Sequence, residues 1–423
     1  MDKELLKTII VQNQEYVLEV ELNKRDINLE ENGNYVFVGV RQAGKSYLLY
    51  QTMQELAKKQ KVEDFVYINF DDERLCNMKA TDLDLILQAY YEMYENKPIL
   101  FFDEIQNIEG WEHFARRLAN QKYRVFITGS NAKMLSKDIA TTLGGRFLNR
   151  YVYPYSFAEF LSANGIKLKD NWLYSKDKHS IQRYFEEYFL YGGFPELLRF
   201  KDKRTWLNNI YSKIFFSDLI VRNRVKNEEA LRMCVHKIAE SIKQPLSYNR
   251  LANMLKTIGI KTSVSSIIDY VRYLQESCLL FSIENYASKF VDKQTIKKHY
   301  FVDNGLLNIF LTDEQTSLLE NLCAIHLYKQ YGEEVYFYNK SIEVDFYLPK
   351  QSTAIQVSYS LSDPQTQERE VQALVKLDKV YHIDKFLIIT RNEAKTIALE
   401  DDREIQVIPI WQWLLTAENK KNA

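Results

Sequence analysis

A phosphate-loop motif constrains what this chain can fold into more than any other feature of its sequence. Residues 39–46 read GVRQAGKS, which fits the pattern G-x-x-x-x-G-K-[ST]. The apolar run 35–38 precedes the motif, and residues 47–54 have the spacing of an amphipathic helix. Glycines let the backbone approach an anion closely, and the start of a helix adds unpaired N–H groups. This context favours a nucleotide-phosphate site over the alternative, a glycine turn with a surface lysine.

The residue types in the loop predict their roles. Lys45 is expected to reach the β- and γ-phosphates, and Ser46 to offer its hydroxyl group to Mg²⁺. The residues expected to contact the nucleotide are Gly39, Val40, Arg41, Gln42, Ala43, Gly44, Lys45, Ser46 and Tyr47.

A second apolar run, residues 99–102, ends in two acids, Asp103 and Glu104. Such a run is typical of a buried parallel strand whose carboxyl end faces a ligand crevice. We expect Asp103 to hold the Mg²⁺ shell and Glu104 to polarise the attacking water. Two acids after a strand can also form a solvated turn, but the phosphate loop favours the catalytic interpretation.

A third apolar run, residues 124–128, is followed by Gly129, Ser130 and Asn131. Ser130 or Asn131 is placed where a sensor of the γ-phosphate would lie. Either residue can instead cap the helix that begins near Ala132, and the sequence leaves both interpretations open.

Arg146 follows two glycines, Gly144 and Gly145. An arginine in this position is a candidate for stabilising the transition state, either in its own site or in that of a neighbouring subunit. The alternative is a surface arginine.

Six segments together resemble a bacterial and archaeal family of AAA-type P-loop ATPases whose C-terminal domain is often related to restriction endonucleases. They are GVRQAGKS (39–46), ILFFDEIQ (99–106), FITGSN (126–131), GGRF (144–147) with YPYSFAEF (153–160), and YGGFPE (191–196). The resemblance implies an α/β fold of the AAA type, ATP as the nucleotide and Mg²⁺ as the metal. The choice of ATP over GTP rests on this resemblance.

The composition of the chain limits its domain count, its charge-driven partners and its redox environment. The 423 residues are 46% hydrophobic and 27% charged, enough for two to four globular domains with large cores. The net charge of −1 gives no global attraction to DNA or to acidic lipid. The four cysteines lie far apart without metal-type spacing, which indicates free thiols in a reducing cytoplasm. We expect neither a secretory signal nor a membrane span.

The pattern predicts four parts along the chain. They are a P-loop ATPase domain (1–155), a helical lid (156–226), a winged-helix domain (227–305) and a nuclease-like domain (306–423). In the third part, three predicted helices precede two strands, and the helix 263–275 is the candidate for reading a DNA groove. That helix is rich in serine and nearly uncharged, so we favour a connector or protein-contact module over DNA binding.

In the fourth part, the predicted order of elements, α-β-β-β-α-β, resembles the restriction-endonuclease-like fold. Glu320 and Asp345 stand where the glutamate and aspartate of that family would fall. Where the family has Glu-x-Lys, this chain has Gln356 and Ser358, and Lys340 is a weak candidate for a migrated lysine. We therefore expect a degenerate nuclease site that is used for binding.

The sequence as a whole predicts Mg²⁺-dependent ATP hydrolysis that serves as a conformational switch or motor. The partner is an unknown macromolecule, either protein or nucleic acid, and a homo-oligomer is left open. The alternatives are a DNA-binding regulator and a metal-dependent nuclease that act through the C-terminal domains.

Overall fold

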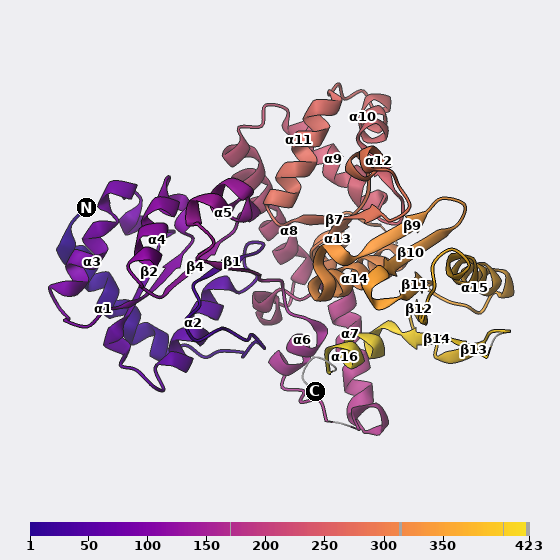
Figure 1. Cartoon of the computed structure of the whole chain (residues 1–423), viewed down its shortest axis with the longest axis horizontal. Coiled ribbons are helices and arrows are strands. Elements are labelled where there is room, and N and C mark those ends of the chain that lie inside the picture. The colour runs from indigo at the N-terminus through magenta and orange to yellow at the C-terminus, as the bar shows by residue number, and fades with distance from the viewer. Residues whose placement is uncertain (170, 313–314, 401, 420–423) are drawn as a thin grey trace. The chain divides into compact units, whose positions relative to one another are not determined.

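The computed structural model describes residues 1–169, 171–312, 315–400 and 402–419 (Figure 1). Contacts along the chain gather in two compact units. The first comprises residues 1–153 with 276–278, and the second comprises residues 154–275 with 279–423. Each unit is built round its own β-sheet.

The first unit contains a parallel sheet. In the part of this unit that the structure describes, the strand order is β2-β3-β4-β1-β5, and all pairings are parallel. The strands are β1 (Tyr35–Val38), β2 (Phe65–Asn69), β3 (Ile99–Asp103), β4 (Val125–Gly129) and β5 (Leu148–Tyr151). All residues of β1, β3 and β4 are buried, as expected for apolar strands covered on both faces. The carboxyl ends of these three strands therefore lie side by side at one edge of the sheet.

Helices cover this sheet. They are α1 (Lys3–Glu19), α2 (Lys45–Leu56), α3 (Asp84–Tyr91), α4 (Trp111–Asn120) and α5 (Lys137–Leu143). Helix α1 packs against β2, α2 and α3, whereas α4 packs against β4 and α5. Stacked rings of Phe101 and Phe126, with centroids 4.8 Å apart, join β3 to β4 inside the core. The α/β class predicted from the sequence is confirmed.

The second unit begins with helices and continues into a mixed sheet. Its helices are α6 (Phe157–Ala163), α7 (Asp177–Tyr191), α8 (Lys203–Lys213) with a π-helical continuation (Ile214–Val221), α9 (Glu228–Glu240), α10 (Tyr248–Thr257), α11 (Val264–Glu276), α12 (Phe290–Thr295), α13 (Asn304–Asn308), α14 (Gln315–Tyr331), α15 (Pro364–Asp378) and α16 (Ile410–Asn419). Its strands are β6 (Leu246–Ser247), β7 (Leu280–Asn285), β8 (Ile296–Phe301), β9 (Tyr336–Asn339), β10 (Glu343–Leu348), β11 (Thr353–Val357), β12 (Lys385–Thr390), β13 (Lys395–Ala398) and β14 (Glu404–Pro409).

One sheet runs through the second unit. Over the described residues its strand order is β13-β14-β12-β11-β10-β9-β7-β8-β6. Strands β7 and β9 are parallel neighbours, and the Asn285 side chain both donates to and accepts from the backbone of Asn339, at 2.6 and 3.0 Å. Helices α14 and α15 pack on this sheet (Figure 1). The sheet therefore continues across the boundary expected near residue 305.

The segment expected to form a lid is tied to the same unit. The backbone N–H of Gly193 donates to Asp303 at 2.8 Å, and the Asn304 side chain donates to the carbonyl of Phe189 at 3.0 Å. The elements expected for a winged helix and for a nuclease-like domain follow one another in the predicted order. The four-part division and these two domain names stay predictions. Among the described helices, none has both the length and the apolar character needed to cross a bilayer.

Candidate functional site

The loop 39–44 leaves the carboxyl end of β1 and enters helix α2, which begins at Lys45. Gln42 and Gly44 have φ values of 57° and 94°, so the backbone turns twice through left-handed conformations. A Cβ atom on Gly39 would lie 2.0 Å from the carbonyl oxygen of Val152, a distance that only glycine avoids. This curled backbone beside a helix start has the form of a phosphate cradle.

Lys45 lies inside this loop and is only 4% exposed. Its ammonium group donates to the carbonyl oxygens of Gly39 at 3.2 Å and Val40 at 3.1 Å. The same Nζ lies 3.4 Å from Oε1 of Glu104. Lys45 is therefore a buried charge between the loop and Glu104 and not a surface lysine.

Asp103 ends β3 and is fully buried. Its carboxylate accepts hydrogen bonds from the hydroxyl groups of Ser46, Thr128 and Tyr67, the last at 2.7 Å. Burial raises the pKa of Asp103 and the charge of Glu104 raises it further, while the three hydroxyl donors oppose both effects. Ser46 and Asp103, the two expected magnesium ligands, thus lie in direct contact.

Glu104 follows β3 in a left-handed conformation, with φ at 51°. Its N–H donates to Thr128 at 3.0 Å, and its Oε2 accepts from the side chain of Gln106 and from the N–H of Ser130. Burial alone would raise the pKa of this carboxyl, but the charge of Lys45, the hydrogen bond from Gln106 and the charge of Arg41 together lower it below its usual value. The group is therefore ionised at neutral pH.

The two polar residues after β4 make different contacts. Ser130 is buried, donates its N–H to Glu104 at 3.2 Å, and accepts from Gln106 at 3.4 Å on its hydroxyl oxygen. Asn131 accepts from the N–H of Lys133 at 2.8 Å and so caps a short 3₁₀ helix, Ala132–Leu135. Ser130 belongs to the surroundings of Glu104, and Asn131 is the helix cap.

Arg146 lies at the other end of the strands. Its carbonyl oxygen accepts from the Asn34 side chain at 3.3 Å, just ahead of β1, and nearby Leu148 pairs with Tyr35 at the start of β1. The guanidinium group is exposed and donates to the carbonyl of Gly144 at 3.0 Å. The phosphate loop begins at the opposite, carboxyl end of β1. The structure therefore does not bring Arg146 to the loop of its own chain.

Three residues near the site were not singled out by the sequence motifs. Tyr67 and Thr128 hold Asp103, and Gln106 holds Glu104. Thr128 is the polar residue in an apolar strand, and Gln106 follows the acidic pair by two positions, so both had a visible signal. The signal for Tyr67 is absent, because a tyrosine in an apolar strand is ordinary core.

A second cluster of charges lies in the second unit, where Glu320 from α14 and Asp345 from β10 come together. The lysine beside them is Lys298 from β8, whereas Lys340 is exposed in the turn between β9 and β10. Nζ of Lys298 lies 3.1 Å from Glu320, 3.3 Å from Asp345 and 3.4 Å from Glu343. The weak sequence candidate, Lys340, is replaced by a lysine from a strand that the sequence placed in another domain.

The electrostatics of this cluster follow from burial. Burial raises the pKa of Glu320 to about 7, against the attraction of Lys298. For Lys298, burial favours the neutral form, but the attraction of the three carboxylates raises its pKa above the usual value, so the ammonium persists. Gln356 accepts from the N–H of Asp345 at 2.8 Å and donates to Glu370 at 2.7 Å. Within the described ranges, no group of three or more His, Cys, Asp or Glu residues is arranged to hold a metal ion.

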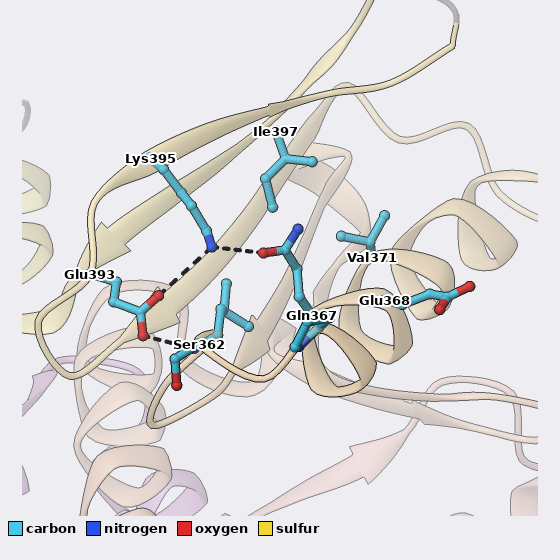
Figure 2. Close-up of a pocket in the computed structure, with 9 residues that line it drawn as sticks. Ser362, Gln367, Glu368, Val371, Glu393, Lys395 and Ile397 are labelled. Atoms are coloured by element: carbon cyan, nitrogen blue, oxygen red, sulfur yellow. Dashed lines mark hydrogen bonds and ion pairs between the residues drawn. The ribbon is translucent and has the colours of Figure 1, made fainter.

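An open pocket of about 570 Å³ lies beside α15 and β13 (Figure 2). Figure 2 shows Lys395 pointing toward Gln367 and Glu393, and Nζ of Lys395 donates to Gln367 at 2.7 Å. None of the residues predicted to form a site lines this pocket. The nucleotide site is therefore defined by its side chains and not by this hollow.

The cradle formed by the loop, Lys45, Asp103 and Glu104 defines a P-loop nucleotide-binding protein. Residues 31–161 match the AAA domain family, and residues 182–317 match a domain of unknown function. An uncharacterized protein of Methanocaldococcus jannaschii is 32% identical over 434 residues, which cover 98% of this chain and 96% of that protein. An uncharacterized protein of Haemophilus influenzae is 28% identical, with 90% of this chain and 94% of that protein covered. The chain belongs to this family of AAA-type P-loop proteins.

The chain also has a distant similarity to solved structures. The Walker-type ATPase of Pyrococcus abyssi is 14% identical with a TM-score of 0.39, and the match covers 73% of this chain and 95% of that chain. The Cdc6p protein of Pyrobaculum aerophilum is 13% identical with a TM-score of 0.27, and the match covers 69% and 88% of the two chains.

Proposed function

We propose that this protein hydrolyses ATP in a Mg²⁺-dependent reaction and uses the reaction as a conformational switch or motor on a macromolecular partner. The observation that carries the proposal is the position of Lys45, which lies inside the phosphate loop and 3.4 Å from Glu104. A basic group that faces phosphates next to an ionised carboxylate is the arrangement that phosphoryl transfer to water requires.

The residues present fit a nucleotide and its metal ion. Gly39 lets the loop pass directly beside Val152, and the left-handed turns at Gln42 and Gly44 curl its backbone as a phosphate cradle requires. Ser46 and Asp103 supply a hydroxyl and a carboxylate, which are the oxygen ligands that Mg²⁺ prefers. Bound Mg²⁺ would neutralise the charge that develops between the β- and γ-phosphates.

The remaining roles follow from the contacts of Glu104. Its ionised carboxylate would orient the attacking water and accept its proton. Gln106 and the N–H of Ser130 hold one carboxylate oxygen, and Lys45 faces the other. When Lys45 engages phosphates, it would leave Glu104, and the freed oxygen would face the water. This exchange of partners links binding to hydrolysis.

The choice of ATP over GTP is supported by the family and not by a motif that recognises the nucleobase. Residues 23–26 spell Asn-Lys-Arg-Asp, the letters of a guanine-reading set. They precede the phosphate loop, and Arg25 in their middle donates to the carbonyl oxygens of Ala43 and Tyr153, at 3.0 and 2.9 Å. This segment therefore fastens the loop to the strand end, so we propose ATP and include GTP as a competitor in the experiment below.

For the partner, we favour a protein over DNA at the predicted winged helix. Val264 and Ile268 on α11 are 37% and 43% exposed, and the serines at the start of this helix bond mainly to one another. An apolar, nearly uncharged face suits a protein surface better than a phosphate backbone.

The test is phosphate release by purified protein with ATP and Mg²⁺. We expect activity in the wild type, loss of nucleotide binding and hydrolysis in Lys45→Ala, and retained binding with roughly 10²- to 10⁴-fold slower turnover in Glu104→Gln. Fluorescent ATP analogues measure binding, with GTP as competitor. Lys24→Ala is the matched control, because this exposed lysine lies outside the loop. Turnover at the wild-type rate in Lys45→Ala would refute the assignment.

The partner can be captured with the same variant. Glu104→Gln should accumulate in the ATP-bound state and retain any partner that this state favours. A pull-down from cells that compares Glu104→Gln with Lys45→Ala separates ATP-dependent partners from background.

A further inference from the structure

The centre formed by Glu320, Glu343 and Asp345 in the second unit already contains a cation, the ammonium group of Lys298. Lys298 is 0% exposed. Strand β8 carries it next to α14 and β10, and alternate residues of β8 place Tyr300 on the same face. The three carboxylate oxygens lie 3.1 to 3.4 Å from Nζ. Because an ammonium group has three donors, it can address all three carboxylates at once.

A divalent metal ion does not fit beside this ammonium. Mg²⁺ requires oxygens at about 2.0–2.1 Å and Ca²⁺ at about 2.3–2.6 Å, so either ion would have to take the place of Nζ to reach the same carboxylates. At a short distance in a buried site, the positive charge of Lys298 would also repel the ion.

Protein donors other than Lys298 also engage two of these carboxylates. The Tyr300 hydroxyl donates to the same oxygen of Glu320 at 2.8 Å, and the N–H of Val357 donates to Oδ2 of Asp345 at 2.9 Å. These two bonds fix the carboxylates around Lys298.

Gln356 is not a weakened ligand in this arrangement. Its carbonyl oxygen accepts from the N–H of Asp345 at 2.8 Å, and its amide nitrogen donates to Glu370 at 2.7 Å. A glutamate at this position would face Glu370 with a like charge, so the amide is the form that this network requires.

We propose that Lys298 takes the place of the divalent metal ion that a nuclease-like centre would hold, so that this centre is a metal-independent core of the second unit. The structure accounts for both departures from the nuclease pattern. The cation comes from Lys298 on β8, and the amide of Gln356 accepts from the backbone N–H of Asp345 and donates to the carboxylate of Glu370.

The first test uses the nucleotide-free protein and Mn²⁺ as the probe. Electron paramagnetic resonance should detect no Mn²⁺ site at this centre, that is, no site that is lost in Asp345→Asn but kept in Asp103→Asn. Addition of EDTA should not change the melting temperature of the protein. A site with submillimolar affinity that disappears in Asp345→Asn but not in Asp103→Asn would overturn the proposal. This test needs no folded Lys298 variant, and it is independent of ATP hydrolysis.

The second test removes the internal cation. Lys298→Ala should melt at a lower temperature than the wild type, and Mn²⁺ at about a hundred times its dissociation constant should raise the melting temperature of this variant by about 5 °C. The matched control is Lys297→Ala, the adjacent residue on β8, which pairs with Glu284 at 3.0 Å on a partly exposed site. Mn²⁺ should not stabilise the control. If Lys298→Ala folds and gains no stabilisation from Mn²⁺, Lys298 does not stand in for a metal.

Discussion

Gln106 donates a hydrogen bond to Glu104 and a longer one to Ser130, so one amide group joins the proposed base to the residue after β4. Its carbonyl oxygen is buried and has no hydrogen-bond partner among the described residues. That oxygen lies against Gly129, where an added Cβ atom would approach it to 2.4 Å. Gln106 is therefore held in place by packing, and its free acceptor lies beside the carboxylate that is expected to orient water.

We predict that Gln106→Leu moves the acidic limb of the pH profile of kcat to higher pH. The hydrogen bond from Gln106 stabilises the ionised form of Glu104 and lowers its pKa, so loss of this bond raises the pKa. Because only the carboxylate accepts a proton, activity should be lost at a higher pH than in the wild type. Because the pKa of Glu104 lies below its usual value, steady-state phosphate release has to be followed from about pH 3 to 8 to record the limb.

The control for this prediction is Gln121→Leu, an exposed glutamine at the end of α4. It should leave the profile unchanged. A Gln106→Leu enzyme that is slower at every pH, with the limb in its original place, would show that Gln106 supports the fold and does not tune Glu104.

At the scale of elements, the corner between α7 and α13 fixes how the helices of the second unit meet its sheet. Gly193 donates to Asp303 at 2.8 Å, and Asp303 also caps α13 through the N–H groups of Gly305 and Leu306. One carboxylate thus joins two elements that are 110 residues apart in sequence. This junction needs the backbones to lie closer than a side chain permits.

We predict that Gly193→Ala lowers the free energy of unfolding of the second unit by about 3 kcal/mol. The added Cβ atom would lie 2.2 Å from the carbonyl oxygen of Tyr155, so the backbone must move and the bond to Asp303 must lengthen. Urea unfolding followed by tryptophan fluorescence measures the change.

Gly259→Ala is the matched control for this substitution. No atom lies within 4 Å of its Cβ position, and the cost of its positive φ is about 1 kcal/mol. Equal effects of the two substitutions would contradict the close-packing argument.

At the scale of the whole molecule, the position of Arg146 bears on assembly. It lies at the amino ends of the strands, a strand length of about 13 Å from the loop, because β1 has four residues at about 3.3 Å each. An arginine in this place can stabilise a transition state only in a neighbouring subunit.

We predict that mixing Arg146→Ala with Lys45→Ala subunits restores part of the ATPase activity. Each variant alone should be at least roughly 100-fold slower than the wild type. In a mixed oligomer, the intact loop of one subunit meets the intact arginine of the other. Phosphate release by mixtures, with assembly verified by light scattering, measures the recovery.

Arg116→Ala serves as the matched control, since Arg116 is an exposed arginine on α4. This variant should be as active as the wild type. Mixed oligomers without any recovery would assign Arg146 a structural role.

We also predict that the protein does not cut DNA in the presence of Mg²⁺ or Mn²⁺. A metal-dependent nuclease needs an ion that activates water at the scissile phosphate, and Lys298 occupies the place of that ion here. Plasmid, linear and single-stranded DNA should stay intact over hours. If the DNA is nicked and Asp345→Ala abolishes the nicking, both the degenerate assignment and the proposed role of Lys298 are wrong.

The nucleotide-binding half of the molecule was accessible to sequence reasoning. The strand that begins at Tyr35, the loop that begins at Gly39 and the helix that begins at Lys45 follow one another directly in sequence. The hydrophobic periodicity and the phosphate-loop motif were therefore enough to place them. The same is true of Asp103 and Glu104, because an apolar run that ends in two acids, in a chain with a phosphate loop, is typical of a buried parallel strand whose carboxyl end faces a crevice. These features are local, and local patterns specify them.

Tertiary structure alone decided which distant residues share a site. Lys298 meets Glu320 and Asp345 across separations of 22 and 47 residues, and β7 meets β9 across the boundary drawn near residue 305. The parallel pairing of β5 with β1 also placed Arg146 at the amino ends of the strands, away from the loop of its own chain. Such contacts depend on the order of strands in a sheet and on which face of each strand turns inward. A single sequence does not specify the strand order. The hydrophobic pattern of a strand indicates that the strand is buried, but it does not indicate which neighbouring strand it pairs with.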